Sequence, residues 1–195
     1  MSRVSLNIRH FLSRWLRREN GALTVEALLI FPLFVLTVTL TYTFYDAFRQ
    51  STANLKAAYT VSDLISREKD GINDTYVTSM HLLMQRMVNN ESEMRMRLSF
   101  IRFKEDEDRL VVDWSTSCGF ADIWTNDNIE TLRDRLPPLS DLEPLIIVET
   151  VNDYDWKVKP PWLDTDYQFE NFIFTRPRVA DQISADDLSE QGCTA

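Results

Sequence analysis

One carboxylate stands where a charged side chain is costly. Glu26 directly precedes residues 27–45, a run of nineteen residues without a charged side chain. An acid at the start of a helix can simply be hydrated and favoured by the helix dipole. It can also do chemistry, because cleavage of the chain after Gly21 would make Ala22 a new N-terminus. Glu26 would then lie one helical turn away and could neutralise that α-ammonium group, or one on a neighbouring helix.

The chain has two cysteines, Cys118 and Cys193. An oxidising compartment would favour a disulfide between them, which would tie the C-terminal tail to the middle of the chain. The alternatives are free thiols or a bridge to another chain. Two distant cysteines together with His10 and His81 do not supply four ligands in a zinc-site pattern, so we expect no bound metal.

The remaining polar residues give little indication of catalysis. Two pairs of closely spaced acids are Asp153/Asp155 and Asp164/Asp166. Such pairs can serve glycoside hydrolysis or calcium binding, but neither lies in an EF-hand pattern, and a solvated acidic surface is the simpler interpretation. The four glycines disfavour a glycine-rich phosphate loop, and no histidine is suggestively placed for Ser115 or Ser117. We therefore predict that the protein is not an enzyme and needs no cofactor.

The apolar run predicts a helix that crosses a membrane. Nineteen residues rise roughly 28 Å in a helix, close to the ~30 Å hydrocarbon core of a bilayer. Glu26 and Asp46 bracket the run, so we expect a transmembrane helix over residues 22–46. One alternative is a buried core helix. Another is a cleaved signal peptide, although the run ends in Tyr-Asp-Ala-Phe-Arg, which lacks a small-x-small cleavage site.

Charge predicts the orientation of this helix. Residues 1–21 contain five arginines and one glutamate, a net charge of +4, so the whole-chain charge of −9 leaves −13 on the remainder. By the positive-inside rule, residues 1–21 form a basic leader in the cytoplasm and the chain after the span is exported. The acidic body also argues against nucleic-acid binding, which needs a basic surface.

Beyond the membrane, helical spacing continues over residues 47–70 as a stem, and Gly71 is a suitable stop. Residues 71–195 form the exported part, in which Asn73 or Asp74 caps a second helix. One face of that helix carries Tyr76, Met80, Leu83, Met84 and Met87. Strands are expected over residues 94–100, 110–114, 145–151 and 169–175, and a short helix over 127–135. The acidic turn at residues 105–108 predicts that the first two strands form a hairpin. We predict an α+β fold: a long N-terminal transmembrane helix continuing into a small antiparallel-sheet domain with one or two further helices.

Gly21, Glu26 and Pro32 together carry a resemblance to a known family. A glycine with a glutamate five residues later, between a basic leader and an apolar helix, resembles the class III signal of type IV prepilins. The segment Glu26-Ala-Leu-Leu-Ile-Phe-Pro32 is similar to the N-terminal motif of TadE-like minor pseudopilins, although that family often has Phe or Tyr where this chain has Ala27. The body resembles the family pattern in Val112-Asp-Trp114-Ser115, in residues 145–154 and in Arg176-Pro177-Arg178.

The resemblance implies that a prepilin peptidase cuts between Gly21 and Ala22, and that Glu26 acts in processing or assembly. The protein would be a minor pilin-like structural or assembly protein of a tight-adherence (Flp-type) pilus. It would be a single-pass protein of the bacterial inner membrane, with a cytoplasmic N-terminus and a periplasmic C-terminal domain. Its partners would be other pilins and minor pseudopilins through the membrane helix, the prepilin peptidase, the inner-membrane assembly platform and the lipid bilayer.

Within the membrane helix, Pro32 would remove one hydrogen bond and kink the span. The threonines at 37, 39, 41 and 43 would satisfy freed carbonyls or bond to partner helices, or they are simply tolerated in the span, which is the simpler interpretation. The alternative to a pilin-like role is a signal-anchored periplasmic binding or regulatory protein without pilin-type processing.

Overall fold

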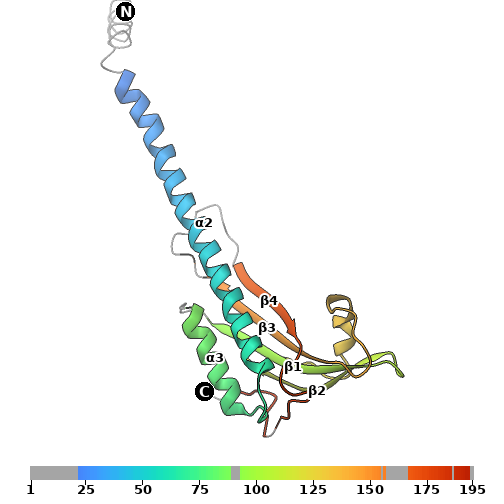
Figure 1. Ribbon diagram of the computed structural model, residues 1–195. Coiled ribbons are helices and arrows are strands. Elements are labelled where there is room, and N and C mark those ends of the chain that lie inside the picture. Colours follow the sequence, from blue (N-terminus) through green and yellow to red (C-terminus); the bar gives the residue numbers. More distant parts are fainter. Residues whose placement is uncertain (1–21, 89–92, 155, 157–166, 186, 194–195) are drawn as a thin grey trace, which may run out of the picture. The chain divides into compact units, whose positions relative to one another are not determined.

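The computed structural model describes residues 22–88, 93–154, 156, 167–185 and 187–193 (Figure 1). In chain order they form helices α2 (Ala22–Ser66) and α3 (Asp74–Val88), strands β1 (Met94–Lys104) and β2 (Arg109–Cys118), the 3-10 helix η2 (Ile129–Arg135), and strands β3 (Pro144–Tyr154) and β4 (Tyr167–Thr175). The described residues belong to two units, residues 22–46 and the residues from Ala47 onward. The predicted α+β class is confirmed, because a long apolar helix precedes an antiparallel sheet and a further helix.

Helix α2 ends close to the predicted stop. The last turn is closed by the amides of Arg67 and Glu68, which donate to the carbonyls of Leu64 and Ile65. Gly71 follows with a φ of 91°, a conformation that glycine adopts readily because it lacks a Cβ. The stem predicted over residues 47–70 is therefore helical as far as Ser66.

Helix α3 begins as its sequence predicts. The Asn73 side chain accepts a hydrogen bond from the amide of Tyr76 at 2.9 Å, which makes Asn73 the N-cap. The predicted apolar face is confirmed in part, since Met84 is buried and Tyr76 and Met80 pack against the core. Met87 is instead 38% exposed, and Val77 and Val88 are buried. The face of α3 that packs on the sheet thus includes Val77 and Val88 and excludes Met87.

The four strands form one sheet in the order β2-β1-β3-β4, and every neighbouring pair is antiparallel. The predicted β1–β2 hairpin is confirmed, and both of its strands are longer than expected. A register shift between Phe100 and Ile101 pairs these residues with Trp114 and Val112, so Asp113 is an extra residue in β2. Such a bulge bends the strand and increases its twist.

Side chains from the two faces of the sheet build two cores. On one face, the C-terminal part of α2 and helix α3 cover the sheet (Figure 1). This larger core includes Ala57, Ala58, Val61 and Ile65 of α2 and Leu98, Phe100, Ile146 and Val148 of the sheet. On the other face η2 covers a smaller core, formed by Ile101, Leu110, Ile129, Leu132, Leu145 and Ile147.

The outer edge of β2 is occupied by side chains and by the C-terminal tail. The amide of Leu110 donates to the Glu130 side chain at 3.2 Å, and the amide of Val112 donates to the Asn126 side chain at 2.7 Å. The amide of Ser117 donates to the Glu190 carbonyl at 2.9 Å. Gln191 forms a parallel bridge with Ser117, and the amide of Gly192 donates back to the Ser117 carbonyl. The tail therefore extends the sheet by a short strand-like segment on this side.

Candidate functional site

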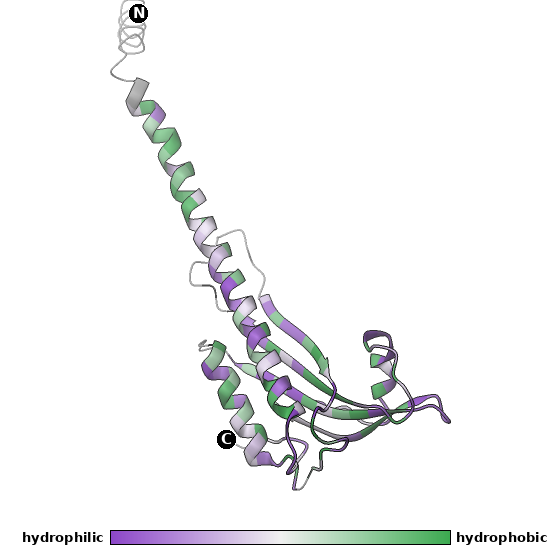
Figure 2. Cartoon of the chain, viewed as in Figure 1, coloured by the Kyte–Doolittle hydropathy of each residue, from purple (hydrophilic) through white to green (hydrophobic). Residues whose placement is uncertain are grey.

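The N-terminal part of α2 is an apolar helix that the described part of the chain leaves exposed. Leu28, Leu29, Phe31 and Phe34 are 63–70% exposed. Successive helical residues point about 100° apart, so these four side chains lie on different sides of the helix. Figure 2 shows hydrophobic residues along this part of α2. This stretch makes α2 long and apolar enough to cross a membrane.

Glu26 lies in the second turn of this helix. The helix begins at Ala22, four residues earlier, so the two residues are one turn apart on one face. The Glu26 side chain is exposed, and no described residue forms an ion pair with it. Gly21 lies outside the described residues, so cleavage after Gly21 and the role of Glu26 stay predictions.

Pro32 lies inside α2, where it cannot donate to the carbonyl of Leu28. The threonines at 37, 39, 41 and 43 do not donate a hydrogen bond to this carbonyl in its place. Each hydroxyl donates instead to the carbonyl four residues earlier, at 2.8 Å in Thr37 and Thr41 and 2.9 Å in Thr39 and Thr43. Their hydrogens are thus satisfied inside the helix, and each threonine is compatible with an apolar environment. The kink at Pro32 stays a prediction.

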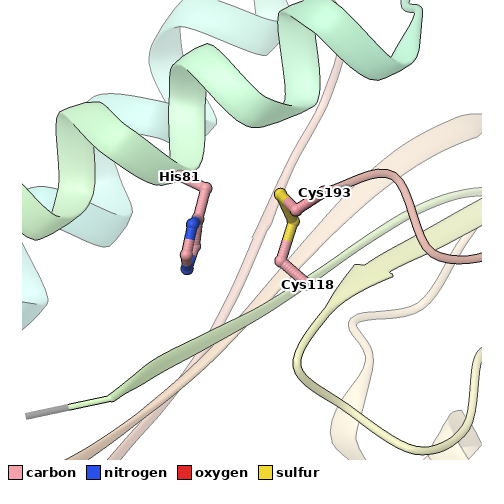
Figure 3. Close-up of side chains that lie close together, drawn as sticks. All are labelled: His81, Cys118 and Cys193. Carbon is pink, nitrogen blue, oxygen red and sulfur yellow. A yellow bond between two sulfur atoms is a disulfide. The ribbon is translucent and has the colours of Figure 1, made fainter. Parts of the chain in front are cut away.

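The two cysteines lie together, as predicted. Cys118 at the end of β2 and Cys193 in the tail form a disulfide with a Cα–Cα distance of 5.2 Å. His81 of α3 lies beside this bridge (Figure 3). Its Nε2 is 2.8 Å from the carbonyl oxygen of Met94. The sequence did not place His81 near the cysteines, because 37 residues separate it from Cys118.

A buried ion pair on the face of the sheet away from α3 was not predicted from the sequence. The Arg97 Nε donates to Glu149 at 2.6 Å, and the two side chains are only 13% and 10% exposed. The indole N–H of Trp124 donates to the same carboxylate oxygen at 2.5 Å. The guanidinium lies 4.8 Å from the ring centre of Phe120 and 4.3 Å from that of Trp124. The one available signal was an acid inside the apolar strand predicted over residues 145–151.

This ion pair borders a polar groove of about 330 Å³, which Arg135 and Phe172 also line. The Glu149 carboxylate already accepts from Arg97 and Trp124, so it is held as a structural partner. Asp153, from the first predicted acidic pair, pairs with Arg95 at 3.4 Å. Its companion Asp155, and both members of the Asp164/Asp166 pair, lie outside the described residues.

Many polar groups of the domain are thus engaged with one another, and the N-terminal part of α2 is an apolar surface that the described residues do not cover. Comparisons with models of protein families, with curated proteins and with solved structures found no match to this chain.

Proposed function

We propose that this protein is a minor pilin-like subunit of a tight-adherence (Flp-type) pilus, held in the bacterial inner membrane by α2. The observation that carries this proposal is the uncovered apolar segment of α2, which begins at Ala22 and contains Glu26 as its one acid before Asp46. Such a segment can be stored in a bilayer and can later pack against similar helices of other subunits. A core helix of a soluble protein would instead be covered by its own chain.

The rest of the chain supports the same topology. The five arginines of residues 1–21 favour a cytoplasmic N-terminus. The disulfide between Cys118 and Cys193 favours an oxidising compartment for the domain, as in the bacterial periplasm. The leader, the span and the periplasmic domain therefore follow one another along the chain as they do in a prepilin.

Glu26 gives the proposal its mechanism. A carboxylate at the edge of a membrane helix is costly unless it is paired or hydrated. Cleavage between Gly21 and Ala22 would create a cation one turn away, on the same helix or on a neighbouring one. Pairing across two helices would set how far one helix is displaced along the other. A prepilin peptidase would then be needed before the subunit can assemble.

The first test is the mass of the mature N-terminus. The full chain is produced with and without a prepilin peptidase, and the membrane-extracted protein is analysed by mass spectrometry. We expect a chain that begins at Ala22 when the peptidase is present and at Met1 when it is absent. A chain that still begins at Met1 in the presence of an active peptidase would remove the processing step from the proposal.

The second test replaces Glu26 by Gln, which keeps the size of the side chain and removes its charge. We expect normal membrane insertion and lost piliation. The matched control is Glu19→Gln, which changes an acid of the leader that cleavage would discard, and it should leave piliation unchanged. If Glu26→Gln also leaves piliation intact and no cleavage occurs, the signal-anchored alternative is the better description.

A further inference from the structure

Three side chains of the kind that bind metals meet between α3 and the end of β2. The imidazole of His81 and the sulfur atoms of Cys118 and Cys193 offer ligand atoms that all lie within 4.8 Å of one another (Figure 3). They come from a helix, a strand and the C-terminal tail. In the oxidised chain the two sulfurs are bonded to each other, so they cannot bind a metal as thiolates.

The hydrogen bond of His81 decides which ring nitrogen is available. Its Nε2 lies 2.8 Å from the carbonyl oxygen of Met94. A carbonyl oxygen only accepts, so Nε2 carries the hydrogen, and in the neutral ring Nδ1 keeps its lone pair. Metal-binding histidines generally donate their other N–H to a carbonyl or carboxylate, which fixes the tautomer and the ring orientation. His81 already has this arrangement.

The surroundings suit a complex without net charge. Cys118 is 2% exposed and belongs to the larger core, and Cys193 packs against that core. Two thiolates cancel the charge of a divalent cation, which avoids the cost of burying a net charge. Hydrogen bonds between Ser117 and the backbone of Glu190 and Gly192 keep the tail beside β2, and none of them requires the sulfur–sulfur bond.

We propose that the reduced protein binds one thiophilic divalent cation, of the zinc type, through His81, Cys118 and Cys193. Three protein ligands leave the fourth tetrahedral position to water. The sequence predicted no metal site because these residues do not supply four ligands in a zinc-site pattern, whereas the fold brings three of them together. Metal and disulfide would exclude each other, and either one would tie the tail to β2.

The chemistry needs a reductant, for which a phosphine serves in the test. The disulfide takes up two electrons and two protons, and the phosphine becomes a phosphine oxide with the oxygen of water. The cation then replaces the protons of the two thiols, so two protons are released for each metal bound.

The experiment uses the full chain in detergent micelles, reduced by the phosphine and titrated with Co²⁺ and then with Zn²⁺. We expect one Co²⁺ per chain with the visible spectrum of a tetrahedral site and a sulfur-to-cobalt charge-transfer band, both lost when Zn²⁺ displaces it. The variant His81→Ala should lose the tetrahedral spectrum. His10→Ala, which changes the other histidine of the chain, should keep it. The double variant Cys118→Ser/Cys193→Ser should show no charge-transfer band.

Three results would overturn the proposal: no cobalt spectrum with the reduced chain, the same spectrum in His81→Ala, or equal binding by the oxidised chain. Because His81→Ala retains both cysteines, its oxidised form shows by circular dichroism whether the variant folds. That comparison decides the question even if the double cysteine variant does not fold. The result is independent of the pilus proposal, which is tested by N-terminal processing.

Discussion

Removal of Glu149 should destabilise the domain strongly. The change Glu149→Ala would leave the Arg97 guanidinium, which is 13% exposed, without its counter-charge, and the Trp124 indole N–H without its acceptor. Loss of one partner from a buried ion pair typically costs about 3–5 kcal/mol, because the other charge stays buried and uncompensated. We therefore expect the free energy of unfolding to fall by about that amount.

A second ion pair on the same two strands provides a matched control. Arg95 and Asp153 also join β1 to β3, but their side chains are 32% and 49% exposed and lie 3.4 Å apart. An exposed pair contributes about 0–1 kcal/mol, so Asp153→Ala should change the unfolding free energy little. Both variants are measured as full chains in detergent micelles by guanidinium unfolding, followed by tryptophan fluorescence.

A double replacement separates the net contribution of the pair from the cost of breaking it. Arg97→Met/Glu149→Leu removes both charges together and keeps apolar volume on the sheet. It should be less destabilising than Glu149→Ala alone, since no buried charge is left unpaired. If Glu149→Ala costs no more than Asp153→Ala, burial does not set the strength of this pair and the reasoning is refuted.

Three further predictions concern the same domain. Replacing Cys118 and Cys193 by serine should lower the free energy of unfolding by about 4.5 kcal/mol in the chain-entropy model, given their separation of 75 residues; equal guanidinium midpoints for the variant and the oxidised parent would contradict this. Burial raises the pKa of Tyr76 to about 12, and the negative charge of Glu68 and the hydrogen bond between Tyr76 and Glu68 act in the same direction. Its neutral form therefore stabilises the fold fully below pH 10, and this contribution, about 1 kcal/mol after allowance for solvent screening, is lost as the pH rises from 10 to 12. Tyr76→Phe should flatten that part of a stability–pH curve, and an unchanged curve would count against the shift. Asn73→Ala should cost about 1 kcal/mol in thermal or guanidinium unfolding, because it removes the N-cap of α3; a loss no larger than that of an exposed mid-helix replacement would argue against the cap.

Local patterns were enough to predict most elements of the fold. The alternation of apolar and polar residues from Met94 predicted β1, and the acidic turn before Arg109 predicted the hairpin. The end of β2 was missed because Ser115, Thr116 and Ser117 are polar, although the structure buries the last two almost completely. Their hydroxyls bond within the sheet or to the tail, and a single sequence does not show such partners.

The predictions of the site were limited by contacts between distant residues. The apolar helix and the cysteine pair could be predicted, since length, charge and residue type are visible in the chain itself. The position of His81 beside the disulfide depends on how α3 packs against β2, and the partnership of Arg97 with Glu149 depends on the register of β1 against β3. Both are set by tertiary packing. The exposure of Met87 has the same cause, since an apolar side chain does not by itself show how far the face of α3 that packs on the sheet extends.

The occupied edge of β2 limits how this sheet can grow. A four-stranded sheet has two edges, and here the outward amides of β2 at Leu110, Val112 and Ser117 already have acceptors. An incoming strand would have to displace Glu130, Asn126 and a tail anchored by a disulfide before it could form main-chain hydrogen bonds there. These three amides are therefore closed to an added strand, and this edge of the sheet is protected against pairing with a strand of another chain.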